Sequence, residues 1–409
     1  MNLCAWRTSK LVMTMALALV ATTACNSKRN SSGGGGSDPT PGSGTGAGPA
    51  ATGPILIGHF ASMSGAEATF GQSTDNGVRL AMEERNAAID AGKLKGRKIE
   101  VKTLDDQGKT QEAGTAVNRL INEDHVVAIL GEVASGLSLA GGAVAQHYSV
   151  PMISPSSTNP QVTQVGDMIF RVCFLDEFQG KVMAKFAKDE LKATKVAILF
   201  DQSQPYSQGL ADFFEKPFTE AGGTIVTRQA YNSSNPDVSA QLSSVKEAAP
   251  DLVVLPGYYT QAANIARQAR KLDITVPFLG GDGWDSSKLE EIGGDAVQGS
   301  YYSNHYSPEE QSPVVQEFVK KYQAKYNQLP DGLAALGYDA ANLLFQAIDK
   351  SPSLSGKDLA ATIAASKDFV GVTGAITIDP NRDASKSAVV VQVDHGKRTP
   401  IKRYPADLK

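Results

Sequence analysis

Short apolar runs alternate with stretches of helical periodicity from residue 55 onward. Runs rich in β-branched residues predict strands, whereas apolar residues spaced three and four apart predict amphipathic helices. Continuously apolar strands separated by helices are typical of a parallel sheet covered on both faces, so we predict an α/β fold. In chain order, we expect strands at 55–60, 99–104, 126–130, 196–200, 224–228 and 252–255, and helices at 71–91, 110–122, 208–221, 238–248 and 260–272.

This alternation occurs twice, over residues 55–171 and 196–302, which predicts two similar Rossmann-like lobes, each with its own parallel sheet. The rest of the chain completes neither a third lobe nor a separate domain, so we expect it to return to the first two. A hinge made of several chain crossings favours bending about a cleft. The expected elements there are helices at 314–326 and 332–348 and strands at 375–378 and 388–393. The predicted lobes are 55–175 with about 304–380, and 176–303 with about 381–409.

Polar turns follow four of the apolar runs. Ligands of an open parallel sheet bind outside the carboxyl ends of its strands, so these turns are expected to face one another. The turns carry Ser135, then Ser156 with Thr158, then Tyr258, and finally Asp282. Hydroxyl groups suit a carboxylate, and an acid suits an ammonium group. The four turns therefore predict an amino-acid site.

The same residues also have structural interpretations. Ser135 and Thr158 lie where a helix is expected to begin, so either is a candidate N-cap. Asp282 lies between two glycines and is a candidate for an Asx turn. Tyr258 is adjacent to Tyr259, and we prefer Tyr258 because it is nearer the end of its strand. Nearby, we expect Glu132 to be structural or solvated, and Trp284 to belong to a core or lobe interface.

The N-terminal residues 1–54 are not predicted to be part of the folded domain. Arg7 and Lys10 precede an apolar stretch that is too short to span a bilayer and that ends in small residues before Cys25. We predict a lipoprotein signal peptide at 1–24 with Cys25 as the lipidated residue; an ordinary secretory signal is the alternative. Residues 25–54 are mostly Gly, Ser, Thr, Pro and Ala, which predicts a flexible tether. The expected location is the cell envelope or periplasm, anchored to a membrane.

Composition narrows the class of function. The formal net charge is −4 over 409 residues, so the chain lacks the excess of basic residues that is typical of nucleic-acid-binding proteins. Of three cysteines, only Cys173 lies in the folded part, so we expect no intramolecular disulfide and a buried, apolar Cys173. The five histidines lack metal-ligand spacing, and neither Ser64-Gly65 nor Ser135-Gly136 is part of a nucleophile elbow. We therefore expect no cofactor, no metal and no enzymatic activity.

Six motifs in a fixed order carry a family resemblance. They are Ala61-Ser62-Met63-Ser64-Gly65, Leu104-Asp105-Asp106, Val150-Pro151-Met152-Ile153-Ser154-Pro155, Gln204-Pro205-Tyr206-Ser207-Gln208-Gly209, Gly280-Gly281-Asp282-Gly283-Trp284 and Gly337-Tyr338-Asp339-Ala340. From about residue 55 to 397, the chain resembles type I periplasmic binding proteins, specifically the leucine/isoleucine/valine-binding receptors of branched-chain amino-acid ABC importers. The resemblance implies a two-lobed Venus-flytrap fold with three crossings between the lobes.

The resemblance also implies a role for each site residue. Ser135 and Thr158 match hydroxyls that hold a ligand carboxylate, with a backbone contact at Ser156. Asp282 and Tyr258 match groups that hold the ammonium after closure. The aromatic positions that border the ligand side chain match Phe70 and Tyr206.

Two departures from the family pattern stand out. The best-known receptors have glutamate where this chain has Asp282, whose side chain is one methylene shorter. They also carry a disulfide in the first lobe, whereas Gly108 and Ala134 occupy the regions where its cysteines would fall.

We expect a monomeric, lipid-anchored solute-binding protein that captures an amino acid by lobe closure and delivers it to an ABC permease in the inner membrane. A branched-chain or aliphatic amino acid is the preferred ligand, and amides, urea and aromatic acids are the alternatives. Two rival functions share the fold: an outer-membrane lipoprotein that regulates envelope enzymes, and a sensory receptor. A hydrolase would require a nucleophile–base pair that the sequence does not show.

Overall fold

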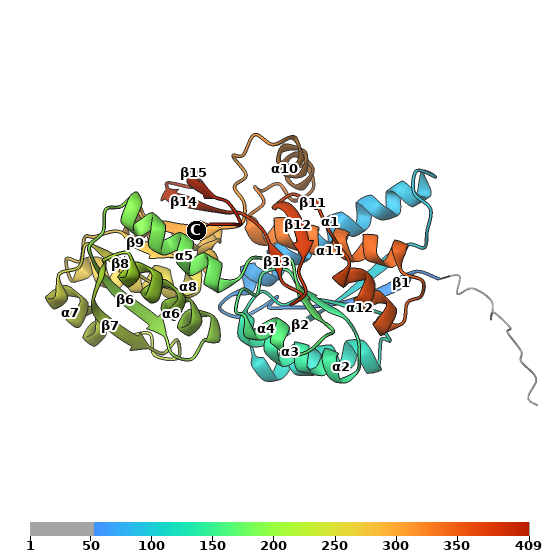
Figure 1. Ribbon diagram of the computed structural model, residues 1–409, viewed down its shortest axis with the longest axis horizontal. Coiled ribbons are helices and arrows are strands. Elements are labelled where there is room, and N and C mark those ends of the chain that lie inside the picture. The colour runs from blue at the N-terminus through green and yellow to red at the C-terminus, as the bar shows by residue number, and fades with distance from the viewer. Residues whose placement is uncertain (1–52, 409) are drawn as a thin grey trace, which may run out of the picture. The chain divides into compact units, whose positions relative to one another are not determined.

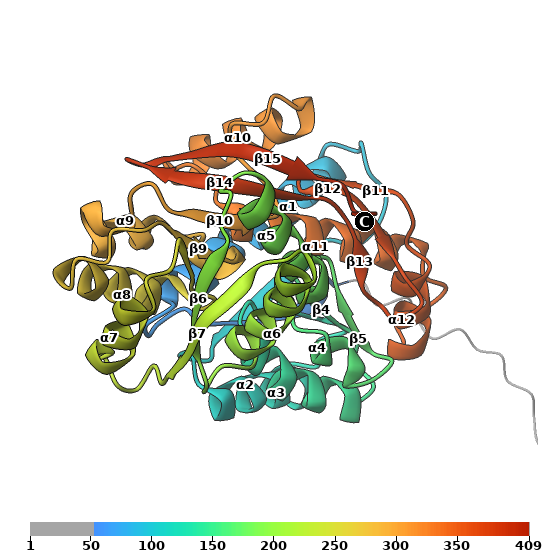
Figure 2. The same cartoon turned by 60° about the vertical axis from the view of Figure 1, so that its left-hand side comes forward.

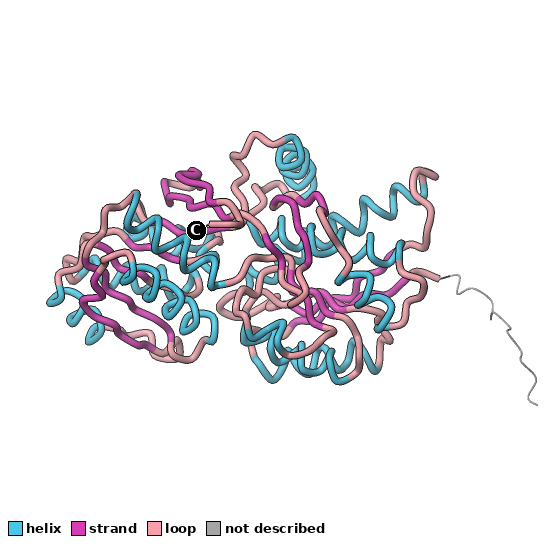
Figure 3. The backbone as a smooth tube through the Cα atoms, viewed as in Figure 1, coloured by secondary structure: helices cyan, strands magenta, loops and turns pink. Residues whose placement is uncertain are grey.

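The computed structural model describes residues 53–408. The predicted signal peptide, Cys25 and all but the last residues of the tether lie outside that range. Two large sheets, each with helices on both faces, organise the described chain (Figures 1 and 3). The α/β architecture with two lobes built on mainly parallel sheets is confirmed. No helix between residues 53 and 408 is both long enough and apolar enough to cross a membrane.

The first lobe contains a five-stranded, fully parallel sheet in the order β2-β1-β3-β4-β5. Its strands are β1 (Ile55–Ala61), β2 (Ile99–Asp105), β3 (Ile129–Leu130), β4 (Met152–Ser154) and β5 (Ile169–Arg171). The connecting helices are α1 (Ala68–Asp90), α2 (Thr110–Asn122), α3 (Ser135–His147) and α4 (Gln161–Gln164). Helices α2 and α3 cover one face of the sheet, and α1 covers the other (Figure 1).

The second lobe contains a seven-stranded sheet in the order β15-β14-β10-β9-β8-β6-β7. Its parallel strands are β6 (Lys195–Asp201), β7 (Thr224–Tyr231), β8 (Leu252–Val254), β9 (Phe278–Gly280) and β10 (Tyr301–Asn304). The hairpin of β14 (Ala388–Asp394) and β15 (Lys397–Tyr404) adds an antiparallel edge beside β10 (Figure 2). Its helices are α5 (Asp176–Asp189), α6 (Pro205–Glu220), α7 (Ser239–Ala248), α8 (Tyr259–Lys271) and α9 (Ser287–Gly293), with 3₁₀ turns η1 (Asp282–Trp284) and η2 (Gly294–Val297).

The last third of the chain returns to the first lobe before it ends in the second. It contains α10 (Pro313–Tyr326), α11 (Gly332–Lys350) and α12 (Gly356–Ala364), and a small antiparallel sheet of β11 (Phe369–Gly371), β12 (Gly374–Ile378) and β13 (Ala384–Ser385). Helix α11 packs along α1. The chain thus passes between lobes after β5, after β10 and before β14, which makes three crossings. The residue boundaries proposed for the lobes stay a prediction.

Close packing of α1 against α11 depends on two glycines. A Cβ atom at Gly77 would lie 2.0 Å from the Ala334 carbonyl oxygen, and one at Gly337 would lie 2.5 Å from the Thr74 carbonyl oxygen. Real Cβ contacts are much longer, so any larger residue would force the helices apart. These helices carry Phe70 and Leu333 toward the cleft at their N-terminal ends.

Several elements differ from their predicted bounds for identifiable reasons. The expected strand 126–130 is a strand only at Ile129–Leu130, where it pairs with both β1 and β4. Helix α6 begins three residues early because Pro205 occupies its first turn, where a fixed φ and a missing N–H carry no cost. Strand β15 has no apolar alternation in sequence, and pairing with β14 holds it in place.

Cys173 is fully buried, as predicted for an apolar core residue, and its thiol lies 3.3 Å from the Ser157 carbonyl oxygen. Burial raises the pKa of the Cys173 thiol to about 12, which keeps it protonated at neutral pH.

Candidate functional site

A small cavity lies between the carboxyl ends of strands from the two sheets. It receives side chains from both lobes. The first lobe contributes Phe70, Val133, Ser156 and Leu333, and the second contributes Tyr206, Tyr258, Asp282 and Gly283. Five of the seven ligand-binding residues predicted from sequence therefore meet at one cavity. Ser135 and Thr158 are buried nearby and are absent from its lining.

Asp282 is the acid of this cavity, and partners from α5, α6 and the segment after β10 hold its carboxylate. Its Oδ1 accepts hydrogen bonds from Gln179 Nε2 and from the Tyr206 hydroxyl, each at 2.8 Å. Its Oδ2 lies 3.1 Å from His305 Nε2. None of these is a bond to a nearby backbone N–H, so the Asx-turn interpretation of Asp282 is wrong. Three of about four acceptor sites on the carboxylate are used, which leaves one free.

Glycines flanking Asp282 let neighbouring chains approach it closely. A Cβ at Gly281 would lie 2.3 Å from the Tyr206 hydroxyl, and one at Gly283 would lie 2.7 Å from the Gly257 carbonyl oxygen. The Gly283 N–H also donates to the Tyr206 hydroxyl at 3.1 Å. The local sequence Gly-Asp-Gly therefore packs the turn after β9 against α6 and presents the carboxylate to the cavity.

The electrostatic surroundings keep the neighbours of Asp282 neutral. Burial lowers the pKa of His305, so the neutral imidazole is favoured, and its Nε2–H is the donor to Asp282. Burial, followed by the charge of Asp282, raises the pKa of Tyr206 well above its usual value. The Asp282 carboxylate is thus solvated by neutral donors and has no cation beside it among these partners.

Aromatic rings form the apolar wall of the cavity. Tyr206 and Tyr258 stack with ring centres 5.3 Å apart and an angle of 3° between their planes. Phe70 meets Tyr258 edge-on at 5.4 Å. The Tyr258 hydroxyl is buried without a hydrogen-bond partner, whereas the Tyr259 hydroxyl donates to the Ala66 carbonyl. The structure therefore places Tyr258 in the cavity and Tyr259 outside its lining.

The hydroxyls of the first lobe differ in their contacts. Ser156 Oγ and Thr158 Oγ1 are buried and have no hydrogen-bond partner. Ser135 Oγ accepts a bond of 3.3 Å from the backbone N–H of Asn159. Helix α3 has Ala134 as its N-cap and helix α4 has Pro160, with no capping side chain at either. The capping interpretation is therefore wrong for both Ser135 and Thr158.

Three residues at the site escaped the sequence analysis: Asp176, Gln179 and His305. Both oxygens of Asp176, Oε1 of Gln179 and Nδ1 of His305 are buried acceptor atoms without partners. Asp176 and Gln179 are three residues apart on α5, so they share a helix face. Burial, followed by the charge of Asp282, raises the pKa of Asp176 well above its usual value. The only sequence signal was two polar residues in the first turn of a helix, which is common on any surface.

Two neighbouring residues are structural, as predicted. Glu132 is buried and accepts hydrogen bonds from Ser62 and from the backbone N–H of Ala134, which tie together the loops after β1 and β3. Trp284 is fully buried in the second lobe, where its indole N–H donates to the Leu255 carbonyl at 3.1 Å.

Comparisons with known proteins agree with this architecture. A family model described as "Periplasmic binding protein" matches residues 54–398. The Leu/Ile/Val-binding protein homolog 1 of Brucella suis is 30% identical over 338 residues, which cover 82% of this chain and 89% of that protein.

Two solved structures are similar over nearly their whole length. A leucine-binding protein from Thermotoga maritima is 41% identical with a TM-score of 0.82, covering 86% of this chain and 99% of that one. A branched-chain amino acid transporter substrate-binding protein from Streptococcus pneumoniae, in complex with isoleucine, is 32% identical with a TM-score of 0.80. That match covers 85% of this chain and 99% of the other.

Proposed function

Because the chain belongs to the periplasmic binding protein family, we propose that it captures a small α-amino acid outside the cytoplasm for an ABC importer. One observation carries the proposal: the unpartnered, buried hydroxyl of Ser156 in one lobe and the carboxylate of Asp282 in the other line a single small cavity. Buried polar groups are normally hydrogen-bonded, so these atoms are suited to a polar ligand. The two halves match the opposite charges of an amino-acid backbone.

The ligand carboxylate would lie at the first lobe. Ser156 and Thr158 offer free hydroxyls, and Ser135 is the first residue of the thirteen-residue helix α3. The N–H groups at a helix N-terminus and its dipole favour an anion at that position. One relative is named a Leu/Ile/Val-binding protein homolog, and each of these three amino acids carries such a carboxylate.

The ammonium group would lie at the second lobe. Asp282 has one acceptor site free, and the unpartnered Tyr258 hydroxyl and Asp176 carboxyl add further acceptors close by. A buried ammonium group is costly unless an anion faces it, and Asp282 supplies that anion. Its side chain is shorter than glutamate, but Tyr206, Gln179 and His305 hold it toward the cavity.

The ligand side chain would be aliphatic. The remaining walls are Phe70, Val133 and Leu333, with the rings of the two tyrosines. These apolar walls offer no partner for a charged side chain. The side chains of leucine, isoleucine and valine meet this requirement.

Binding and transport are linked through closure. A ligand that contacts both lobes binds the closed form more tightly than the open form, and this difference shifts the population. Closure would present a surface from both lobes to a permease. A lipid anchor at Cys25, followed by the tether to residue 54, would hold the protein near that permease.

Thermal unfolding of the purified chain with each of the twenty amino acids tests the proposal. A ligand at about 100 times its dissociation constant adds about 2.7 kcal/mol of stability. We expect leucine, isoleucine or valine to raise Tm, and leucinamide and α-ketoisocaproate, which each lack one charge, to leave it unchanged. If no α-amino acid raises Tm, the amino-acid proposal is wrong.

A further inference from the structure

A short set of hydrogen bonds joins the two lobes outside the ligand cavity. The Tyr259 hydroxyl donates to the Ala66 carbonyl at 3.0 Å, and Thr260 Oγ1 donates to the same carbonyl at 2.8 Å. Thr69 Oγ1 lies 2.8 Å from Ser286 Oγ. We call these five residues the latch. Ala66 and Thr69 belong to the first lobe, and the other three belong to the second.

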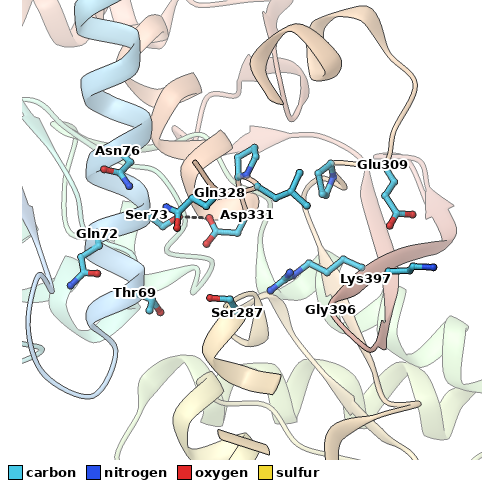
Figure 4. Close-up of a pocket in the computed structure, with 14 residues that line it drawn as sticks. Thr69, Gln72, Ser73, Asn76, Ser287, Glu309, Gln328, Asp331, Gly396 and Lys397 are labelled. Carbon is cyan, nitrogen blue, oxygen red and sulfur yellow. Dashed lines mark hydrogen bonds between the residues drawn. The ribbon is translucent and has the colours of Figure 1, made fainter. Parts of the chain in front are cut away.

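The latch is local because open grooves lie on both sides of it. One groove is lined by Thr69, Gln72 and Ser73 of α1 and by Ser287 of α9; Figure 4 shows Thr69 and Ser287 on its two sides. The other is lined by Glu67 and Tyr258, among others. The lobe contact between these grooves consists of the latch hydrogen bonds together with the Phe70 ring packed against Tyr259.

The latch is connected to the ligand cavity through one side chain. Phe70 lies between them: its ring is 5.4 Å from Tyr258, which lines the cavity, and 5.1 Å from Tyr259, which belongs to the latch. Neither Tyr259 nor Thr260 lines the cavity. Ligand and latch are thus separate contacts that form in the same closed arrangement.

We propose that Tyr259 and Thr260 determine ligand affinity without touching the ligand, by holding the Ala66 carbonyl when the lobes close. This inference rests on the proposed function, because affinity is measured for the amino acid. In the open form water satisfies the same groups, so the latch stabilises only the closed form. Each hydrogen bond contributes a modest net free energy of closure. The loss of one bond therefore lowers the ratio of closed to open molecules by about fivefold. When the open form predominates without ligand, the apparent dissociation constant of the ligand rises by the same factor.

The test compares Tyr259→Phe, Thr260→Val and the double variant with two controls. Tyr301→Phe removes a hydroxyl that accepts from Gln392 within the second sheet, and Thr219→Val removes one that bonds within α6. Calorimetry with L-leucine and L-isoleucine gives the affinities. Amide hydrogen exchange over residues 66–70 at saturating L-leucine reports the latch directly, since the Thr69 N–H donates to the Tyr259 hydroxyl at 3.4 Å.

We expect each single variant to bind both amino acids about fivefold more weakly, by the same factor for each, and the double variant more weakly still. Exchange over 66–70 should speed up in the variants and stay unchanged in the controls. Unchanged affinity and exchange would overturn the inference, and so would a loss confined to one amino acid, which would place these residues in the ligand site. If the parent chain binds neither amino acid, the proposed function fails together with the inference that rests on it. If it binds them and the variants bind equally tightly, only the inference fails.

Discussion

The phenol of Tyr206 and the carboxylate of Asp282 are joined by a hydrogen bond of 2.8 Å inside the second lobe. Because Tyr206 comes from α6 and Asp282 follows β9, this bond orients the acid from a different element. The same ring stacks on Tyr258 and lines the cavity. Tyr206 therefore has two roles, as a wall for the ligand side chain and as a partner that positions the acid.

The first prediction concerns this pair. Asp282→Asn keeps the shape of the side chain but removes the charge that faces the ammonium group, and hydrogen bonds to charged groups contribute about 1.5–3 kcal/mol. We expect amino-acid affinity to fall by a factor of about 10 to 150, measured by calorimetry. Tyr206→Phe retains the ring and should cost only about fivefold. If Asp282→Asn binds as well as the parent chain, the ammonium assignment is wrong.

The second prediction separates the hydroxyls of the first lobe. Ser156 Oγ is buried and has no partner within the protein, so Ser156→Ala should leave the free energy of unfolding unchanged or raise it. Its affinity for leucine should nevertheless fall by about fivefold. Thr158→Val should behave in the same way.

Ser135→Ala is the matched comparison. It removes an acceptor from the backbone N–H of Asn159, so we expect a loss of about 1 kcal/mol in stability without any ligand. Urea unfolding and calorimetry on the three variants provide both quantities. Equal stability losses in all three, with no change in affinity, would contradict the carboxylate assignment.

The third prediction is a pH dependence that arises from His305. Burial lowers its pKa in the folded protein, whereas an unfolded histidine titrates near 6.5. As the pH falls through that value, the unfolded chain takes up a proton that the folded chain does not, so stability falls. The slope due to this group reaches at most about 1.4 kcal/mol per pH unit.

Urea unfolding between pH 8 and pH 5 measures this slope, and His305→Gln should remove it. Asp331 acts in the opposite direction, because burial raises its pKa to about 6 and the folded protein takes up that proton first. The difference between parent and variant therefore isolates His305. Parallel pH profiles for the two proteins would show that His305 titrates normally.

The fourth prediction tests the contact between α1 and α11. Gly77→Ala would place a Cβ 2.0 Å from the Ala334 carbonyl oxygen, so we expect a loss of at least about 1–3 kcal/mol in the free energy of unfolding. Gly114→Ala is a matched control within α2, where the nearest atom would be 3.9 Å away. Alanine favours the helix there, so stability should rise by about 1 kcal/mol. Similar effects of both substitutions would contradict this view of the packing.

The order of apolar runs in the sequence was sufficient to predict the α/β fold, its two lobes and the position of most strands. Those features are local, because a continuously apolar run between amphipathic helices can be buried only within a covered parallel sheet. Elements without such a pattern were missed. Strand β15 is polar and exists because β14 offers it a free edge, which is a contact between strands and not a property of either segment.

The sequence by itself also identified the turns that carry the candidate site, since such turns follow parallel strands. Only the tertiary structure decided which hydroxyls and phenols are free. Ser156 and Tyr258 have no partners, whereas Ser135 receives the Asn159 N–H and Tyr259 reaches the other lobe. The structure also added Asp176, Gln179 and His305. These distinctions depend on contacts between residues far apart in the chain, and local periodicity carries no information about which distant group will meet a given side chain.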